Sequence, residues 1–394
     1  MSISTLTRID EICSTISETY RGKDKKVILI NTSDVLEGKI LNFEEVENKN
    51  LRGQFKKTFK KNDILFSEIR PANKRFAFVN IDDTHNFIAS TKLMVLRPNL
   101  KRVLPEFLYY ILSSDYLLSE MQHLAETRSG TFPQITFSSE LGPFEIELPD
   151  INCQRKIVSI LKNIDEKIEL NNEINDNLLK QAIEIYSDLI KDKDKNGCIG
   201  DYCTIKSGFA FKSNWWTDNG VKVVKIGSIN QDNLDLNSCS YVSSENAVRA
   251  KEFIVKGGDL LIAMTGATIG KFAMVPSLNE GIYVNQRVGK FFLGDNPISR
   301  LPYIYCTLKQ PDIYSEIINR GQGSAQPNIS GGDIMSIPCV ILSKEDIDDF
   351  NQKCKPIFSL MIDRQKENAD LSDLRDSLLP KLMSGEIDVD SIEL

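Results

Sequence analysis

Two long stretches of the chain repeat apolar residues with the alternating 4,3 spacing of a heptad. The first stretch covers residues 157–189, and the second repeats the pattern 193 residues later, over 350–382. This spacing gathers the apolar side chains into one stripe along a helix. A helix of about 33 residues is roughly 50 Å long at about 1.5 Å per residue, too long for one small domain to cover. The pattern therefore predicts two helices that pair as a coiled-coil spacer.

Both predicted helices have polar residues at the same places in the stripe, Asn171 and Asn175 in the first and Arg364 and Asn368 in the second. A polar core position fixes register and partner at some cost in stability. Pro356 is expected to kink the second helix or to delay its start. The positions that we assign to the seam are Ile157, Leu161, Ile164, Ile168, Asn171, Asn175, Leu178, Ile357, Met361, Asn368, Leu371 and Leu378.

Short β-rich runs precede each predicted helix, and they too occur twice. DILFSEIRPANKRFAFV at 63–79 aligns without a gap on DLLIAMTGATIGKFAMV at 259–275. Residues 27–32 match 223–228 at the same offset, and residues 133–136 match 327–330 nearly so. A repeat of about half the chain indicates two copies of a whole domain rather than a solenoid.

The order is therefore domain, helix, domain, helix. We predict an α+β fold, with two similar mixed domains at 1–150 and 197–343 and spacer helices in 151–196 and 344–394. Two equivalent halves on one chain are most simply related by a pseudo-two-fold axis, which makes the helices antiparallel. The charged, glycine-ended segment 191–197 is the predicted end of the first helix.

Charge is distributed unevenly along the chain, whose net charge is −7. Residues 1–150 carry 20 Lys or Arg against 21 Asp or Glu, whereas 341–394 carry 7 against 13. The repeated domains are thus nearly neutral, which leaves room for a basic face on each. No apolar run approaches the roughly 18 residues of a membrane span, and the polar start has no signal-peptide core, so we expect a cytoplasmic protein without membrane contact.

The residues required for common catalytic sites are scarce. The eight cysteines include no CxxC pair and there are two histidines, which disfavours a metal site and imidazole catalysis. Gly266, Gly270 and Lys271 resemble a phosphate loop, but three residues separate the glycines instead of four and Phe272 follows the lysine. In the first copy Arg70 and Lys74 occupy the glycine positions. We therefore interpret the chain as non-catalytic.

Polar loops at equivalent places in the two copies suit contact with double-stranded DNA. Arg reads guanine, Gln or Asn reads adenine, and Lys or Arg contacts phosphate. Solvated surface charge and glycine-rich loops that cap a sheet are the alternative interpretations. The DNA-binding candidates are Lys56, Lys57, Lys60, Lys61, Arg70, Lys74, Arg75, Arg128, Thr131, Gln134, Lys271, Gln286, Arg287, Arg320, Gln322, Gln326 and Asn328.

Four motifs resemble those of specificity (S) subunits of type I restriction-modification systems: DLLIAMTGATIGK at 259–271, VNQR at 284–287, GSAQPNI at 323–329 and LRDSLLPKLMSGEI at 374–387. The resemblance covers the whole chain. It implies two target-recognition domains that each read half of a bipartite DNA sequence, with antiparallel helices as a ruler between them. The first domain departs from the family's glycine loop at residues 68–73.

The resemblance also implies partners. Two modification subunits would dock on this chain and supply S-adenosylmethionine and adenine methylation, and restriction subunits would add ATP- and Mg-dependent translocation and cleavage. One alternative is an S subunit whose partner fuses methylase and nuclease. A second is a duplicated protein-interaction scaffold that does not bind DNA, which the neutral charge balance of the domains leaves open.

Overall fold

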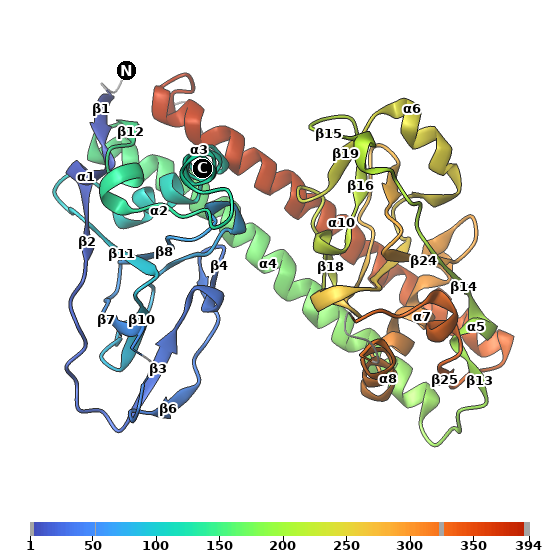
Figure 1. The fold of residues 1–394 in the computed structure, drawn as a ribbon. Coiled ribbons are helices and arrows are strands. Elements are labelled where there is room, and N and C mark those ends of the chain that lie inside the picture. The colour runs from blue at the N-terminus through green and yellow to red at the C-terminus, as the bar shows by residue number, and fades with distance from the viewer. Residues whose placement is uncertain (1–3, 52, 323–326, 390–394) are drawn as a thin grey trace. The chain divides into compact units, whose positions relative to one another are not determined.

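The computed structural model describes residues 4–51, 53–322 and 327–389. The chain divides into two compact units, Met1–Asp165 with Ser372–Leu394 (unit 1) and Glu166–Leu371 (unit 2). Each of the two long helices, α4 (Ile151–Ile190) and α10 (Lys344–Ser384), contributes residues to both units. They are drawn in green and in orange to red in Figure 1.

Within its described residues, unit 1 contains two four-stranded sheets (Figure 1). The first, in the order β2-β11-β8-β9, consists of Cys13–Ile16, Leu93–Pro98, Ile64–Ser67 and Phe76–Phe78. The second, in the order β6-β3-β10-β7, consists of Glu45–Glu47, Lys26–Ile30, Phe87–Ser90 and Phe55–Lys57. The other elements are β1 (Thr5–Arg8), α1 (Ile9–Ile12), η1 (Thr32–Asp34), β4 (Val35–Leu36), β5 (Lys39–Ile40), η2 (Pro71–Asn73), α2 (Pro105–Ser113), α3 (Asp115–Arg128), η3 (Phe137–Leu141) and β12 (Glu145–Leu148).

Unit 2 repeats this plan in the part that the structure describes. Its four-stranded sheet, β14-β24-β21-β22, consists of Thr204–Ser207, Val288–Phe292, Leu260–Ala263 and Phe272–Met274. Its five-stranded sheet, β15-β19-β16-β23-β20, consists of Trp216–Thr217, Ser240–Val242, Val221–Val224, Ile282–Val284 and Ile254–Val255. The other elements are β13 (Gly197–Cys198), α5 (Ile199–Tyr202), η4 (Ser213–Trp215), η5 (Ile226–Ser228), β17 (Ile229–Asn230), β18 (Asn233–Leu234), α6 (Ser244–Ala247), η6 (Val248–Phe253), η7 (Gly266–Thr268), η8 (Pro297–Ser299), α7 (Leu301–Leu308), α8 (Pro311–Gly321), α9 (Gly331–Met335) and β25 (Pro338–Cys339).

The central strands β8 and β21 are buried on both faces. In β8, Ile64 and Phe66 join the core that contains helices α2 and α3, whereas Leu65 joins the core of the second sheet. In β21, Leu260 and Leu261 divide between two cores in the same way. Because successive strand residues point to opposite faces, a continuous apolar run is what a doubly covered strand requires. This arrangement confirms the predicted α+β class with a repeated domain.

Helices α4 and α10 run antiparallel within each unit. In unit 2 the buried Asn171 side chain accepts a hydrogen bond from Arg364 (2.8 Å) and donates one to Asn368 (2.9 Å), while Asn175 donates to the Met361 carbonyl (3.5 Å). In unit 1 the pairing continues with an ion pair between Asp165 and Arg375 (2.8 Å). Thus higher numbers on one helix meet lower numbers on the other.

The remaining seam positions pack along the same pair of helices. Ile157, Leu161, Asn171, Asn175 and Met361 are buried, and Ile164, Ile168, Leu178, Ile357, Asn368, Leu371 and Leu378 are half-buried. The delayed helix start expected from Pro356 was wrong, since α10 begins at Lys344 and continues through the proline. A proline removes one hydrogen bond, and burial of its neighbours Cys354 and Phe358 in the core of unit 2 holds the helix there.

Helices α2 and α3 follow one another directly and are separated at Ser114. Ser114 ends α2, and its side chain then accepts a hydrogen bond from the Leu117 backbone N–H as the N-cap of α3.

No helix in residues 4–51, 53–322 and 327–389 has the length and apolar character needed to cross a membrane.

Candidate functional site

Three backbone segments meet beside the end of β8 in unit 1 and form what we call the unit 1 site: residues 67–70, 90–92 and 133–135. Glu68 N–H donates to the Lys92 carbonyl (3.0 Å), and Ile135 N–H donates to the Glu68 carbonyl (2.9 Å). Arg70 N–H donates to the Pro133 carbonyl (3.1 Å). These hydrogen bonds fix the backbone from which the side chains of all three segments project.

The unit 2 site, residues 263–266, 285–287 and 327–329, has the same three backbone hydrogen bonds. Met264 N–H donates to the Arg287 carbonyl (3.0 Å), and Ile329 N–H donates to the Met264 carbonyl (2.9 Å). Gly266 N–H donates to the Pro327 carbonyl (3.0 Å). The duplicated segments of the sequence therefore build equivalent frames, although few of their side chains are the same.

The turn after β8 keeps its shape without glycine. Gly266 and Gly270 have φ of 73° and 80°, and Arg70 and Lys74, at the equivalent positions, have φ of 46° and 52°. A residue with a Cβ pays roughly 1–2 kcal/mol in the left-handed region. The first copy thus has Arg70 and Lys74 where the second has glycines, and the backbone of the turn follows the same path in both.

A buried aspartate anchors the strand that leads into each site. Asp63, at the start of β8, accepts two hydrogen bonds from the Arg97 guanidinium (2.8 and 2.7 Å) and one from the Lys60 backbone N–H. In unit 2, Asp259 pairs with the Lys290 ammonium (3.1 Å) and accepts from the Lys256 backbone N–H (3.0 Å). The hydrogen bonds that Arg97 donates to Asp63 raise the pKa of the guanidinium. Both aspartates therefore hold the start of the strand that leads into the site.

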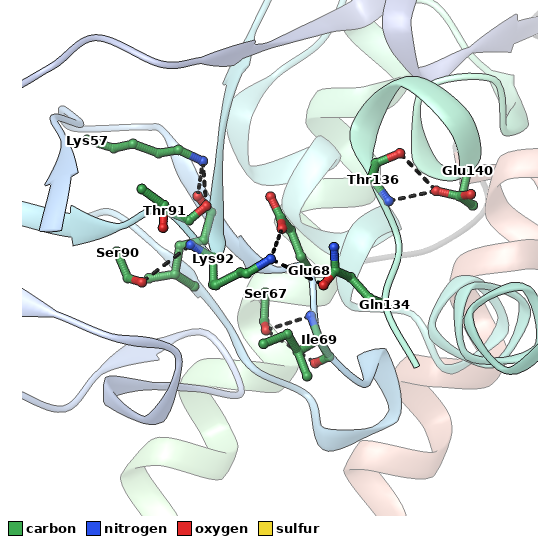
Figure 2. A network of polar contacts seen from close by, with 11 residues as sticks. Lys57, Ser67, Glu68, Ile69, Ser90, Thr91, Lys92, Gln134, Thr136 and Glu140 are labelled. Carbon is green, nitrogen blue, oxygen red and sulfur yellow. Dashed lines mark hydrogen bonds and ion pairs between the residues drawn. The ribbon is translucent and has the colours of Figure 1, made fainter. Parts of the chain in front are cut away.

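The side chains of the unit 1 site are linked to one another, as Figure 2 shows. The Lys92 ammonium donates to Gln134 Oε1 (3.2 Å) and lies 3.5 Å from Glu68 Oε2. Lys57 donates to the carbonyls of Thr91 (3.1 Å) and Leu93 (2.8 Å), and burial lowers its pKa. Lys57 therefore holds the turn that presents Lys92.

Three polar side chains of the unit 2 site are exposed and unpaired in the described part of the chain. Gln286, Arg287 and Asn328 are exposed, and none of their side-chain donors or acceptors that the structure describes is satisfied by another side chain. The one local contact is weak: Asn285 Oδ1 accepts from the Arg287 backbone N–H at 3.4 Å. Unit 2 thus presents a free guanidinium and two free amides where unit 1 presents a linked group.

The other predicted contact residues fall into two groups. Some are engaged within the chain: Lys61 with Asp82, Lys74 with Asp115, Arg75 with the Ser33 and Val35 carbonyls, Arg128 with Glu140, and Arg320 with Glu316, Ser336 and the Asp333 carbonyl. Others have side chains without such partners among the described residues: Lys56, Lys60, Arg70, Thr131, Lys271 and Gln322. Gln326 lies outside the described residues.

Two residues at the unit 1 site, Glu68 and Lys92, were not among the sequence-based candidates. The Lys92 carbonyl accepts the backbone hydrogen bond from Glu68 that corresponds to the one accepted by Arg287, which was a candidate. Aligning the NQR motif at 285–287 on Ser90, Thr91 and Lys92 could have found it. Among the described residues there is no group of three or more side chains that could hold a metal ion.

Comparison with known proteins identifies the family. The model of the type I restriction modification DNA specificity domain matches residues 7–180 and 192–350. The type I restriction enzyme HindI specificity subunit of Haemophilus influenzae is 30% identical over 437 residues, covering 92% of this chain and 94% of that protein. The MjaVIII specificity subunit of Methanocaldococcus jannaschii is 21% identical, covering 77% and 75%.

Among solved structures, the chain matches the HsdS subunit from Thermoanaerobacter tengcongensis, with 18% identity, a TM-score of 0.42 and coverage of 98% of this chain and 97% of that one. The S subunit of a type I restriction-modification system from M. genitalium has 18% identity and a TM-score of 0.45, with coverage of 97% and 96%. The family match extends over both copies of the repeated domain, and the Haemophilus influenzae relative matches over 94% of its own length, so this chain belongs to the type I restriction modification DNA specificity family.

Proposed function

We propose that this chain is the sequence-specific DNA-recognition subunit of a type I restriction-modification complex, and that each unit reads one half of a bipartite target in double-stranded DNA. The observation that carries the proposal is the pair of equivalent frames with different side chains. A bipartite target with unlike halves needs two sites that approach the duplex alike and differ in their donors and acceptors. Glu68, Lys92 and Gln134 in unit 1 contrast with Met264, Arg287 and Asn328 in unit 2.

The two kinds of contact divide among the side chains by their chemistry. Lys56, Lys60 and Arg70 in unit 1 and Lys271 in unit 2 are cations without side-chain partners in the described residues, so they are assigned to phosphate contacts. Gln134, Arg287 and Asn328 project from the frames and carry the planar groups that read base edges, so they are assigned to base contacts.

We assign recognition to residues 1–150 and 197–343, and the spacer to the helices of 151–196 and 344–394. The helices α4 and α10, of 40 and 41 residues, would set the number of unread base pairs between the half-sites and dock two modification subunits. Catalysis would belong to the partners: methylation with S-adenosylmethionine to the modification subunits, and ATP- and Mg-dependent cleavage to the restriction subunits. The complex would act in the cytoplasm, where the DNA is.

The decisive experiment is adenine-methylation sequencing of DNA from cells that express this chain with its modification subunits. We expect a split motif with a fixed unread spacer, lost when the chain is deleted. An active modification subunit that methylates the same sites without this chain would overturn the proposal.

The spacer role has a separate test. Inserting one heptad at matched places in α4 and α10 keeps the seam in register and adds roughly 10 Å to each helix. The spacer of the methylated motif should lengthen while both half-sites stay the same. An unchanged spacer in a folded, active complex would show that the helices do not set it.

A further inference from the structure

The two sites differ most at the position where β8 and β21 end, which is Glu68 in unit 1 and Met264 in unit 2. We infer that Glu68 is a specificity-determining residue, which makes unit 1 select a base that carries an exocyclic amino group in the major groove. The inference rests on the proposed function, and it names the chemistry that one half-site must have at one position.

The frame does not require a carboxylate at this position. Met264 makes the same two backbone hydrogen bonds as Glu68, and the residue is 3% exposed. Its sulfur lies 3.8 Å from Ser207 Oγ, within the sheet to which it belongs. Since an apolar side chain fills the place in unit 2, the glutamate of unit 1 is not explained by the fold alone.

Stability does not explain the glutamate either. Its side chain is 18% exposed, so it is largely removed from water, and its closest cation, the Lys92 ammonium, lies at 3.5 Å and is 46% exposed. Such loose, partly exposed ion pairs contribute little to folding. A carboxylate that faces DNA would also be repelled by the phosphates. The positive charges of Lys92 and Lys57 offset part of that repulsion. The Lys92 ammonium lies 3.5 Å from the Glu68 carboxylate, and the negative charge of Glu68 raises the pKa of Lys57, against the lowering by burial and by Lys92.

An ionised carboxylate accepts hydrogen bonds and donates none. In the major groove only cytosine N4 and adenine N6 donate, while guanine and thymine present acceptors. Glu68 therefore fits cytosine or adenine and is repelled by guanine O6 or thymine O4. Because Gln134 Oε1 accepts from Lys92, its amide N–H groups point away from that contact and can donate to an acceptor beside the selected amino group.

The test uses the purified complex of this chain with its modification subunits and a panel of duplexes that carry each of the four bases at each position of both half-sites. Because every base pair carries one amino group in the major groove, the panel also includes duplexes in which adenine is replaced by purine, or cytosine by 2-pyrimidinone, which lack only that group. At one position of the unit 1 half-site, wild type should prefer the base with the amino group over this analogue by about tenfold. E68Q and E68M should lose most of that preference and keep the preferences of the other half-site. Whether adenine or cytosine is preferred identifies the base.

E11Q is the matched control, because Glu11 pairs with Arg102 at 3.0 Å in the same unit but outside the site. It should bind as wild type does. An unchanged base profile in E68Q, an equal loss of affinity for all duplexes, or wild-type binding that does not weaken at any position of the unit 1 half-site when the amino group is removed would overturn the inference. If neither E68Q nor E68M assembles, Glu68 is a folding residue and the inference is also overturned. A wild-type complex without any half-site preference would instead overturn the proposed function.

Discussion

The two units hold the strand before each site with the same carboxylate and a different cation. Asp63 in unit 1 is held by the planar fork of Arg97, and Asp259 in unit 2 is held by the single ammonium of Lys290. The cations do not come from equivalent positions: Arg97 lies one residue beyond the strand partner of Ile64, whereas Lys290 faces Leu261. The two copies of the domain have therefore kept the buried aspartate and changed the cation that binds it. This implies that the fold requires the aspartate at this position and accepts a cation from either of two places.

At the surface of the two sites, too, the backbone is kept while the side chains differ. Their backbone hydrogen bonds coincide, but unit 1 links Lys92, Glu68 and Gln134 to one another, while unit 2 leaves Arg287 and Asn328 free in the described residues. The frame is constant and the reading chemistry varies. Three pairs of substitutions, of decreasing expected effect, test that separation.

The largest effect should come from removing the buried anchors. In D259A, Lys290 would remain as an unpaired cation with an 11% exposed side chain, at a cost of about 3–5 kcal/mol in the free energy of unfolding. In D63A the Arg97 side chain, already 23% exposed, can turn to water, so the cost should be smaller, about 2–3 kcal/mol. Both of the chain's tryptophans, Trp215 and Trp216, lie in unit 2, so their fluorescence during urea unfolding reports D259A.

Unit 1 is followed by amide hydrogen exchange in β8 and β11. D218A, at an exposed aspartate of unit 2, is the control and should change the free energy of unfolding by less than about 0.5 kcal/mol. A larger loss in D63A than in D259A would contradict the idea that burial of the cation sets the cost.

The second effect separates the two reading sites. R287A removes the free guanidinium of unit 2 and should abolish the preference for guanine at one position of its half-site, worth about 1–3 kcal/mol of discrimination. K92A should change base preference less, because its ammonium is bonded to Glu68 and Gln134. Binding to the duplex panel measures both. An equal loss of affinity for every sequence in R287A, with a weaker salt dependence, would identify a phosphate contact instead.

Much of this architecture follows from periodicity. The heptad spacing and the gapless repeat at 63–79 and 259–275 were enough to predict two mixed domains and two long helices, because burial patterns are written along the chain. The roles of single charged residues do not follow from the periodicity of the sequence. Lys56 and Lys57 are adjacent, yet the first is exposed and the second donates to two carbonyls of a turn more than 30 residues away. Tertiary contacts decide which cation is free, and no local pattern records them.

The smallest effect compares the turns after β8 and β21. R70G should raise the free energy of unfolding of unit 1 by up to about 1 kcal/mol, because glycine tolerates φ of 46° without strain and the Arg70 side chain is exposed and has no partner among the described residues. G266A should lower that of unit 2 by about 1 kcal/mol. The added methyl group would have room, since its nearest neighbour, Ile226 Cδ1, lies at 3.7 Å, so only the backbone conformation is at stake.

Tryptophan fluorescence follows G266A, and hydrogen exchange in β8 follows R70G. Changes of the same sign would show that the two turns are not equivalent. If the signs are opposite and R70G also weakens binding to all duplexes alike, then unit 1 keeps a strained arginine at the cost of stability because its charge is needed at the phosphate backbone. Unit 2 has Gly266 at the equivalent position, so another cation must then make its phosphate contact. Lys271, half-buried and unpaired in the described residues, is the candidate, and its replacement should weaken binding to all duplexes alike.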